Sequence, residues 1–449
     1  MHVVRCLLWS ALAAGPLWGV APQDEEPDEE PAPAVVLWHL PAIDALVAGR
    51  LALACDAIDD GRTPDAKGTD EMLERPERLQ EALCSVLEHG AWRVPGSGAT
   101  PWIERGLEPR HRPYLRALAA RLSAQRALAA ARADLAAGAA PARLRARLVL
   151  AGEVARALDV RFLAELAAAA GARESAGDFE AALLSTLRRD AGACRELDAA
   201  WKALAAGLRV AALDALVECA RPAALPVLAR RLDDQPDLRV AVLARLGTLA
   251  QGLEEPVDAH AAAAVRALLD APQASLRREA ALCAGRLEDA ESAPRLVELL
   301  ESGERSERDA ALWALRRIGR LGFAADPRPW RVWLADEQEW WSERWPVCLA
   351  ALGDPRSARA LAALDEIARR RWRRDELALV VAEMGGVDAD LAERRCLALG
   401  ALASRAGLGF LRECMTLGDE PLRSAAAAAW RAASDLPPPL DGGLRPDAH

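Results

Sequence analysis

The chain has 449 residues, of which 52% are hydrophobic and 28% are charged, and its formal net charge is −10. This length exceeds what one compact core usually holds, so we expect several domains or one elongated array. The composition excludes wholesale disorder. The acidic balance disfavours nucleic-acid binding, because proteins that bind a phosphate backbone carry a basic face.

The first 21 residues have the pattern of a secretory signal. Arg5 supplies a positive charge, residues 6–20 form an apolar run too short for a membrane span, and small residues fit cleavage after Ala21. We therefore expect export to the periplasm or the cell surface. An uncleaved N-terminal membrane anchor is the alternative. No later apolar run reaches span length without charge, so we expect no membrane span after signal removal.

A linker and a helical region follow. Residues 22–34 combine acidic residues with proline, which predicts a solvated tether. Residues 35–207 form an N-terminal helical region, interpreted as possible degenerate repeats that cap an array. Its clearest helix runs from Pro76 to Glu88 and stops at Gly90. A long Ala-rich helix is expected from Pro113 to Gly138.

A repeated unit is legible from residue 208 onwards. The segment Leu276–Leu287 returns 31 residues later as Glu307–Ile318, and Ser292–Leu300 between them predicts a companion helix. A fixed step near thirty residues is typical of a solenoid. We assign residues 208–433 to stacked helix-turn-helix units and the whole chain to the all-α class with no sheet, since no period-two strand pattern occurs. Further copies begin at Leu208, Leu238, Leu391 and Leu422, and the other companion helices are expected at Ala223–Leu232, His260–Leu269, Arg356–Arg371 and Leu408–Thr416.

The units resemble HEAT repeats, especially the short bacterial kind. The shared pattern is apolar–Arg–x–x–Ala–Ala–x–x–Leu/Ala–Gly after a turn with Asp, and Leu276–Gly285 with Asp270 upstream matches it best. The resemblance covers about residues 205–433. It implies a curved α-solenoid that binds a partner, without implying an activity. It also implies a ladder between units formed by the turn Asp and the repeated Arg, except where Glu301-Ser302-Gly303 departs from the Asp turn and where Ala392 replaces the Arg.

Tryptophans and arginines cluster near the C-terminal part of the array. An insertion at about 322–345 interrupts the repeats and holds five tryptophans, whose indoles suit either a binding hot spot or packing inside an irregular repeat. The run Arg369–Arg374 surrounds Trp372. It suits either an anionic polymer or the negative end of a companion helix.

We place a protein-binding surface near residues 278–345, because second helices usually line the concave side of HEAT-like arrays. Arg and Trp are enriched in interface hot spots. The predicted partner-binding residues are Arg278, Arg286, Trp313, Arg316, Arg317, Trp330, Trp333, Trp340 and Trp341.

No catalytic or metal motif stands out. Ser97 lacks the GxSxG context, HExxH and CxxC are absent, and the histidines show no metal spacing. We expect no cofactor and no metal, buried cysteine thiols rather than disulfides, and a disordered tail at 434–449. The expected function is a non-catalytic scaffold for a protein partner. The alternatives are an enzyme on a helical array (lyase or glycosidase-like) and a binder of an anionic polymer.

Overall fold

The computed structural model describes residues 45–95, 102–234, 236–253, 259–353, 358–385 and 389–434. These residues belong to one compact unit that begins at Ile43. The predicted leader, the linker and all of the tail beyond Ser434 lie outside the described residues. Of the helices in these ranges, none combines the length and the apolar character that crossing a membrane requires.

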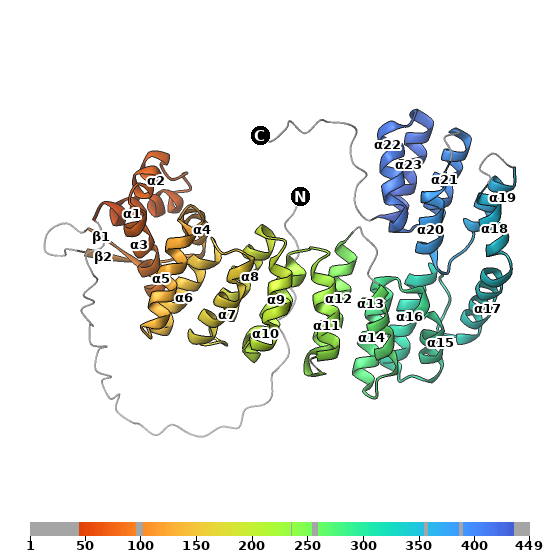
Figure 1. Ribbon diagram of the computed structural model, residues 1–449, viewed down its shortest axis with the longest axis horizontal. Helices are drawn as coiled ribbons and strands as arrows, with labels where there is room; N and C mark the ends of the chain where they lie inside the picture. The colour runs from red at the N-terminus through yellow and green to blue at the C-terminus, as the bar shows by residue number, and fades with distance from the viewer. Residues whose placement is uncertain are drawn as a thin grey trace, which may run out of the picture. The chain divides into compact units, whose positions relative to one another are not determined.

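Helices dominate the described chain, as the sequence predicts, and Figure 1 shows them following one another in pairs. The α-helices are α1 Ala45–Asp59, α2 Ala66–Leu73, α3 Pro76–His89, α4 Arg112–Ala120, α5 Ala124–Ala136, α6 Pro141–Gly152, α7 Val160–Ala169, α8 Ala176–Arg189, α9 Ala193–Ala200, α10 Ala206–Glu218, α11 Ala224–Asp234, α12 Arg239–Gly252, α13 Ala259–Ala267, α14 Ala274–Leu287, α15 Ala293–Ser302, α16 Arg305–Gly319, α17 Pro327–Glu343, α18 Trp345–Leu352, α19 Ala358–Ile367, α20 Arg374–Glu383, α21 Ala389–Leu402, α22 Leu408–Leu417 and α23 Glu420–Ala433. Short 3₁₀ helices are η1 Pro109–His111, η2 Ala157–Asp159, η3 Trp201–Ala203, η4 Pro236–Leu238, η5 Leu268–Asp270, η6 Ala290–Ser292 and η7 Arg405–Gly407.

One hairpin departs from the expected absence of strands. Strand β1 Ala91–Pro95 pairs antiparallel with β2 Trp102–Gly106, so that Ala91 lies opposite Gly106. The prediction of no sheet is wrong for this segment, although the fold class is all-α. Each strand has five residues, and so short a segment does not carry a period-two pattern that distinguishes it from a loop.

The helix expected from Pro113 to Gly138 is split into α4 and α5. The amides of Arg121 and Leu122 bond to carbonyls three residues back instead of four, at 3.1 and 3.0 Å, and this tightening ends α4. The buried leucines of α4 pack with α1–α3, whereas those of α5 pack with α6–α8. Tertiary packing therefore decides the break, because one straight helix would not serve both groups.

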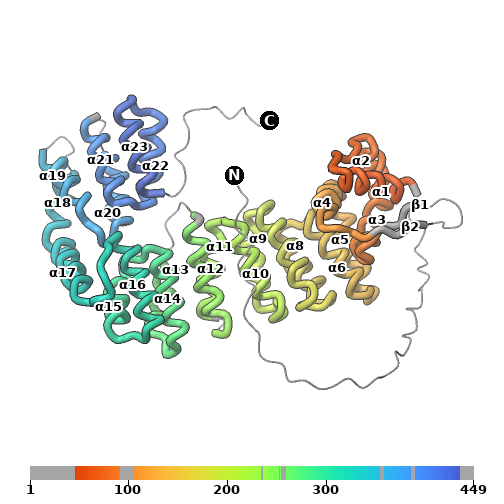
Figure 2. Tube along the Cα trace, turned by 180° about the vertical axis from the view of Figure 1, so that it is seen from behind, coloured from red at the N-terminus to blue at the C-terminus, as the bar shows by residue number. Residues whose placement is uncertain are grey.

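The predicted stacking is confirmed from α6 to α16. In this stretch α6, α8, α10, α12, α14 and α16 pack successively as one layer, and α7, α9 and α11 contribute to the other (Figures 1 and 2). A methyl group at Gly285 of α14 would come within 2.8 Å of Cα of Ala314 in α16, so the glycine of the repeat pattern permits the close approach. The layer crosses residue 207 without a break, and the N-terminal helical region shares the stacked arrangement.

The repeated arginine does not pair with the turn Asp of the resemblance, although Arg277 does contact the next unit, through Glu307 of α16 at 2.6 Å. Its guanidinium also reaches back to the turn before its own helix, as in the bonds Arg239 to Leu232 O (2.7 Å), Arg277 to Ala271 O (2.7 Å), Arg308 to Gly303 O (3.0 Å) and Arg423 to Gly418 O (3.0 Å). Asp270 pairs with Arg295, at 2.7 Å, rather than with Arg277. Carbonyls at the end of a helix lack intrahelical partners, and the guanidinium groups satisfy carbonyls there or in the following turn.

The buried apolar side chains form three cores. The N-terminal core comes mainly from α1–α4, the central core from α5–α17 and the C-terminal core from α17–α23. We call the contact of the first two cores the first junction, defined by Glu81, Asp134, Arg143 and Arg147. The contact of the last two is the second junction, defined by Glu288, Arg374, Arg405 and the tryptophans around Trp341. The eight described cysteines are buried and free, as predicted.

Candidate functional site

Two tryptophans of the predicted partner surface are buried. Trp330 has no exposed surface, and its indole Nε1 donates to the carbonyl of Ala324 at 3.0 Å. Trp340 is 6% exposed and donates to Oε1 of Glu366 at 2.7 Å. A hot spot requires an accessible side chain, so the structure removes both residues from that surface. Packing inside an irregular repeat, the alternative interpretation, describes them.

Trp333 and Trp341 are half-buried. Trp341 stacks on Trp345 with ring centroids 5.1 Å apart, meets Trp372 edge-on at 6.3 Å, and packs against both the central and the C-terminal core. Trp333 lies over Gly319, where a methyl group would come within 3.2 Å of its ring. The tryptophan cluster therefore joins two cores, and Trp333 remains partly accessible beside it.

The remaining predicted residues separate into two groups. Trp313 is 39% exposed, lies against Gly285, and has the guanidinium of Arg317 over its ring at 5.9 Å. Arg286 and Arg317 lie together at the ends of α14 and α16. Arg278 lies two turns before Arg286 on α14 and pairs with its neighbour Glu279. Arg316 donates to the carbonyl of Phe323.

Most arginines of the run form hydrogen bonds or ion pairs with other parts of the protein. The companion helix expected at 356–371 ends at Ile367, and Arg374 begins the additional helix α20. Arg370 pairs with Asp336 and Arg373 with Glu291, while Arg371 donates to the carbonyl of Ala401. Only Arg369 of the run is exposed. A binding site for an anionic polymer would need the other guanidinium groups at the surface.

Arg374 satisfies the ends of two helices at the second junction. It is 4% exposed and donates to the carbonyl of Ile318 in α16 at 3.1 Å, to that of Leu402 in α21 at 2.7 Å and to Glu288 at 2.6 Å. Helix C-termini carry unpaired carbonyls and partial negative charge, so the guanidinium replaces the missing donors. Burial lowers the pKa of Arg374. In Figures 1 and 2, α20 lies between α16 and α21.

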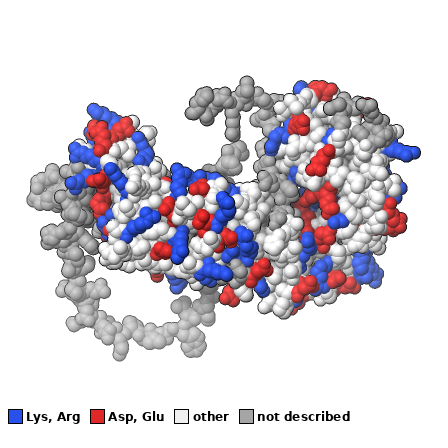
Figure 3. Space-filling model, viewed as in Figure 1, with Lys and Arg blue, Asp and Glu red and all other residues white. Residues whose placement is uncertain are grey.

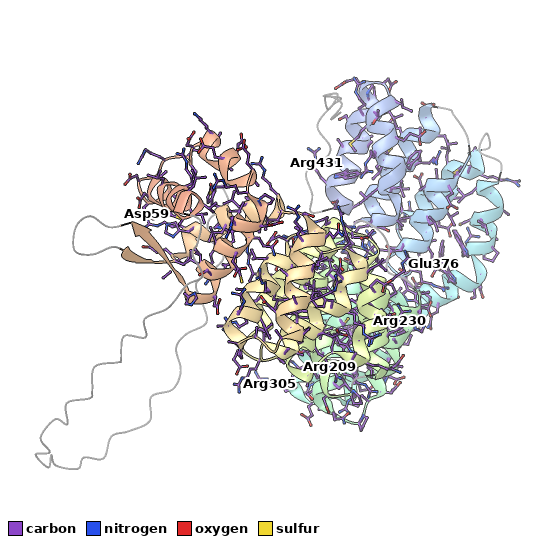
Figure 4. All side chains as sticks on the ribbon, turned by 60° about the vertical axis from the view of Figure 1, so that its left-hand side comes forward. Asp59, Arg209, Arg230, Arg305, Glu376 and Arg431 are labelled. Atoms are coloured by element: carbon purple, nitrogen blue, oxygen red, sulfur yellow. The ribbon has the colours of Figure 1, made fainter. Side chains whose placement is uncertain are left out.

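A cavity of about 70 Å³ lies beside this arginine. The ends of α12, α14, α16, α21 and α23 surround it. We call it the arginine cavity, and its charged lining residues are Arg286, Glu288, Arg317, Arg320, Asp375 and Arg405. Burial raises the pKa of Asp375, which accepts a hydrogen bond from Ser404 Oγ at 2.5 Å. Glu376, labelled in Figure 4, lines a neighbouring hollow on the other side of Glu288.

A shallow apolar pocket opens at the start of α17. Its volume is about 570 Å³, and its lining residues are Phe323, Asp326, Arg328, Pro329, Val332, Trp333 and Asp336. Val332 is 71% exposed although it lies between buried positions of the same helix. Trp333 is among the predicted partner-binding residues and Val332 is not, because a lone valine on a helix carries no signal of exposure.

A buried histidine–carboxylate pair has a structural geometry. His111 is 1% exposed, its Nδ1 accepts the backbone N–H of Glu108 at 3.1 Å, and its Nε2 donates to Asp59 at 2.7 Å. Both ring nitrogens are thus engaged in tying the segment after β2 to the end of α1, where Figure 4 labels Asp59. Among the described residues no group of three or more His, Cys, Asp or Glu is arranged to hold a metal ion.

Charges alternate over the visible surface. In Figure 3, blue and red side chains are interspersed over the described part of the face shown, and no large field of one sign appears on it. Nucleic-acid binders usually gather their basic residues on one face. This face has no such patch.

Comparisons with known proteins add no information about this chain. No family model and no curated protein matches the chain. Among solved structures, the crystal structure of an engineered protein from the Northeast Structural Genomics Consortium is similar over 86% of this chain and 94% of that chain, with 14% sequence identity and a TM-score of 0.27. At that score the likeness carries no argument. The described architecture defines the class: an all-α protein of stacked helix pairs.

Proposed function

We propose that the protein is an exported, non-catalytic scaffold of HEAT-like repeats that binds a protein partner at the apolar pocket. The observation that carries the proposal is the exposure of Val332 beside the half-buried Trp333, above a pocket that no described side chain fills. An exposed apolar cluster with an aromatic residue and a charged rim is the composition of protein-binding sites.

The rim restricts the partner. Asp326, Arg328 and Asp336 line the pocket together with Val332. The carboxylate of Asp336 is 73% exposed, and its contact with Arg370 is long, at 3.4 Å. The surface suits a segment of another protein that inserts one or two apolar side chains and carries a basic residue next to them, since opposite charges at the rim favour encounter and register.

The two alternative functions have less support. An enzyme needs an accessible nucleophile, acid or base, whereas His111 is 1% exposed and both of its ring nitrogens are engaged. A binder of anionic polymers needs accessible guanidinium groups, whereas most of the arginine run holds helices together. Export rests on the leader sequence alone, and N-terminal sequencing of the mature protein tests it: a chain beginning at Pro22 is expected, and one beginning at Met1 or His2 contradicts cleavage.

A capture experiment tests the partner site. The immobilised mature protein is incubated with cell-envelope extract, and each captured protein is quantified for the parent and for Val332→Asp. A charge in the pocket should lower capture of the true partner at least about tenfold, the factor expected for a lost hot spot. Val347→Asp is the matched control, because Val347 is 54% exposed and lies outside the pocket. Equal capture by both variants and the parent would reject the site.

A further inference from the structure

The arginine cavity contains hydrogen-bond donors that lack acceptors. Nη1 of Arg286 and Nε of Arg317 are buried and have no partner among the described residues. Buried donors are nearly always satisfied, and an exception calls for a missing water, ion or ligand. Other arginines with such an atom, for example Arg147, use their remaining N–H groups on carboxylates. Arg286 makes no hydrogen bond or ion pair at all within the described chain.

Helix capping does not account for these donors. Arg405 already donates to the carbonyls of Ala250 and Gln251 at the end of α12, and Arg374 serves α16 and α21. The stem of Arg286 is held across α12, because a methyl group at Gly247 would lie 2.7 Å from its Cδ. A charged side chain is therefore fixed at the cavity without an acceptor, which is the preorganisation that a ligand site requires.

Residues with strained backbone conformations also line the arginine cavity. Five described non-glycine residues have positive φ, and three of them line the arginine cavity: Glu288 (54°), Arg320 (52°) and Ala403 (49°). These residues follow the ends of α14, α16 and α21, positions that glycine usually occupies. Placing a side chain there costs about 1 to 2 kcal/mol per residue. At two of the three positions the chain carries an ionisable side chain instead of glycine, and Arg320 and Glu288 meet at 3.2 Å.

We propose that the arginine cavity binds a small tetrahedral oxyanion of the phosphate type through Arg286 and Arg317, with Arg320 at the entrance. Arginine N–H groups match phosphate oxygens in geometry and charge. The cavity volume of 70 Å³ corresponds to about five water-sized probes, enough for an ion with four oxygens and too little for a larger ligand to enter whole.

The carboxylates at the cavity leave positive charge uncompensated. Glu288 is shared by Arg374, Arg317 and Arg320 at 2.6, 3.5 and 3.2 Å. Asp375 is turned to Ser404. An anion bound to Arg286 would complete the pairing and link the ends of α14 and α16 to the C-terminal core. Phosphate would thus stabilise the second junction.

Calorimetric titration of inorganic phosphate into the purified full-length protein, at constant ionic strength and low chloride, tests the proposal. The parent should bind one ion and unfold at a higher temperature in its presence, since a ligand of the native state stabilises it. Arg286→Gln should lower the affinity at least about tenfold, the contribution of one charge-assisted hydrogen bond. Without phosphate its thermal midpoint should equal or exceed that of the parent.

A control variant tests specificity, and a second cavity variant keeps the test valid if the first does not fold. Arg316→Gln removes the neighbouring arginine, which lies outside the cavity and bonds to Phe323, and it should leave phosphate affinity unchanged. Arg317→Gln provides an independent loss of affinity if Arg286→Gln fails to fold. Glycerol phosphate separates the sources: tighter binding than phosphate assigns a phosphate ester, and equal or weaker binding assigns the free ion. Unaltered affinity in both cavity variants, or no phosphate effect beyond that of sodium chloride, overturns the proposal.

Discussion

At the first junction, two arginines of α6 meet three carboxylates from α3 and α5. Arg147 reaches Glu81 at 2.8 Å and Asp134 at 2.6 Å, and Arg143 reaches the same two groups and Glu88. At the second junction arginines outnumber carboxylates, five to two. Arg374 donates most of its hydrogen bonds to helix carbonyls.

The difference separates a structural network from a candidate ligand site. In the first junction each arginine pairs with more than one carboxylate, and Glu81 and Asp134 each pair with both arginines. Such mutual pairing is what a purely structural network requires. In the second junction the helix ends are satisfied by Arg374 and Arg405, yet Arg286 remains without an acceptor beside a cavity. A polar cluster is thus better judged by whether each charged side chain has a partner than by its number of charges.

The largest effect should follow Arg374→Leu. This variant leaves Glu288 and the carbonyls of Ile318 and Leu402 buried without a donor, and breaking a buried pair in this way costs about 3 to 5 kcal/mol. Urea unfolding monitored by tryptophan fluorescence should show early loss of the C-terminal core, because the tryptophan cluster lies at that junction. A shift below about 1 kcal/mol would mean that water replaces the guanidinium.

A smaller loss is expected for Arg147→Leu at the first junction. Arg147 is as buried as Arg374, at 4% exposure, but Arg143 contacts the same Glu81 and Asp134 and remains in place. The expected cost is about 1 to 3 kcal/mol, below the range for an unpaired buried charge, measured by the same urea titration. A cost equal to that of Arg374→Leu would contradict this redundancy.

The two junctions should respond to acid with opposite sign. Burial alone would raise the pKa of Glu81, but hydrogen bonds and charge from Arg143 and Arg147 outweigh it and lower the pKa below 4.5. Its contribution is present above pH 4.5 and is lost as pH falls through the lowered value. Burial raises the pKa of Asp375 above 3.8, so its ionised form opposes folding at neutral pH and protonation relieves this cost.

Unfolding free energies measured from pH 3 to pH 7 on Glu81→Gln and Asp375→Asn separate these contributions. Glu81→Gln should be less stable than the parent at pH 7, with the difference shrinking below pH 4.5. Asp375→Asn should equal or exceed the parent at pH 7, with the gain shrinking as pH falls towards 3.8. Parallel pH curves for both variants would show that the two carboxylates do not differ in this way.

The smallest effect is expected for Trp372→Phe. Trp372 is 7% exposed, and its Nε1 donates to the carbonyl of Ala290 at 2.8 Å, which ties the segment before α20 to the central core. Phenylalanine keeps most of the apolar contact and removes the donor, so we expect a loss of about 1 kcal/mol. Trp372→Ala should cost more, about 3 to 5 kcal/mol. Equal losses for the two variants would show that the hydrogen bond is the whole contribution.

Local patterns were sufficient to predict most of the helices. Ser292–Leu300 and Leu276–Leu287 lie within α15 and α14 with only small differences at their ends, because apolar spacing, Pro at a start and small residues at close contacts act within a few turns. The hairpin, the break between α4 and α5 and helix α20 were not predicted. Strands of five residues, a local tightening and a helix begun by arginines leave no periodic signal.

The sequence by itself predicted a stack of helix pairs from residue 208 onwards, with a step near thirty residues, since each unit must bury its apolar face on a neighbour. It also determined which residues were candidates at the second junction, including Arg286, Arg317 and the tryptophans. Only the tertiary structure decided their roles. The partners of Arg374 lie 56 and 86 residues away in the chain, at Ile318 and Glu288. Contacts at such separations depend on how the cores meet, and the local spacing of residues carries no record of that.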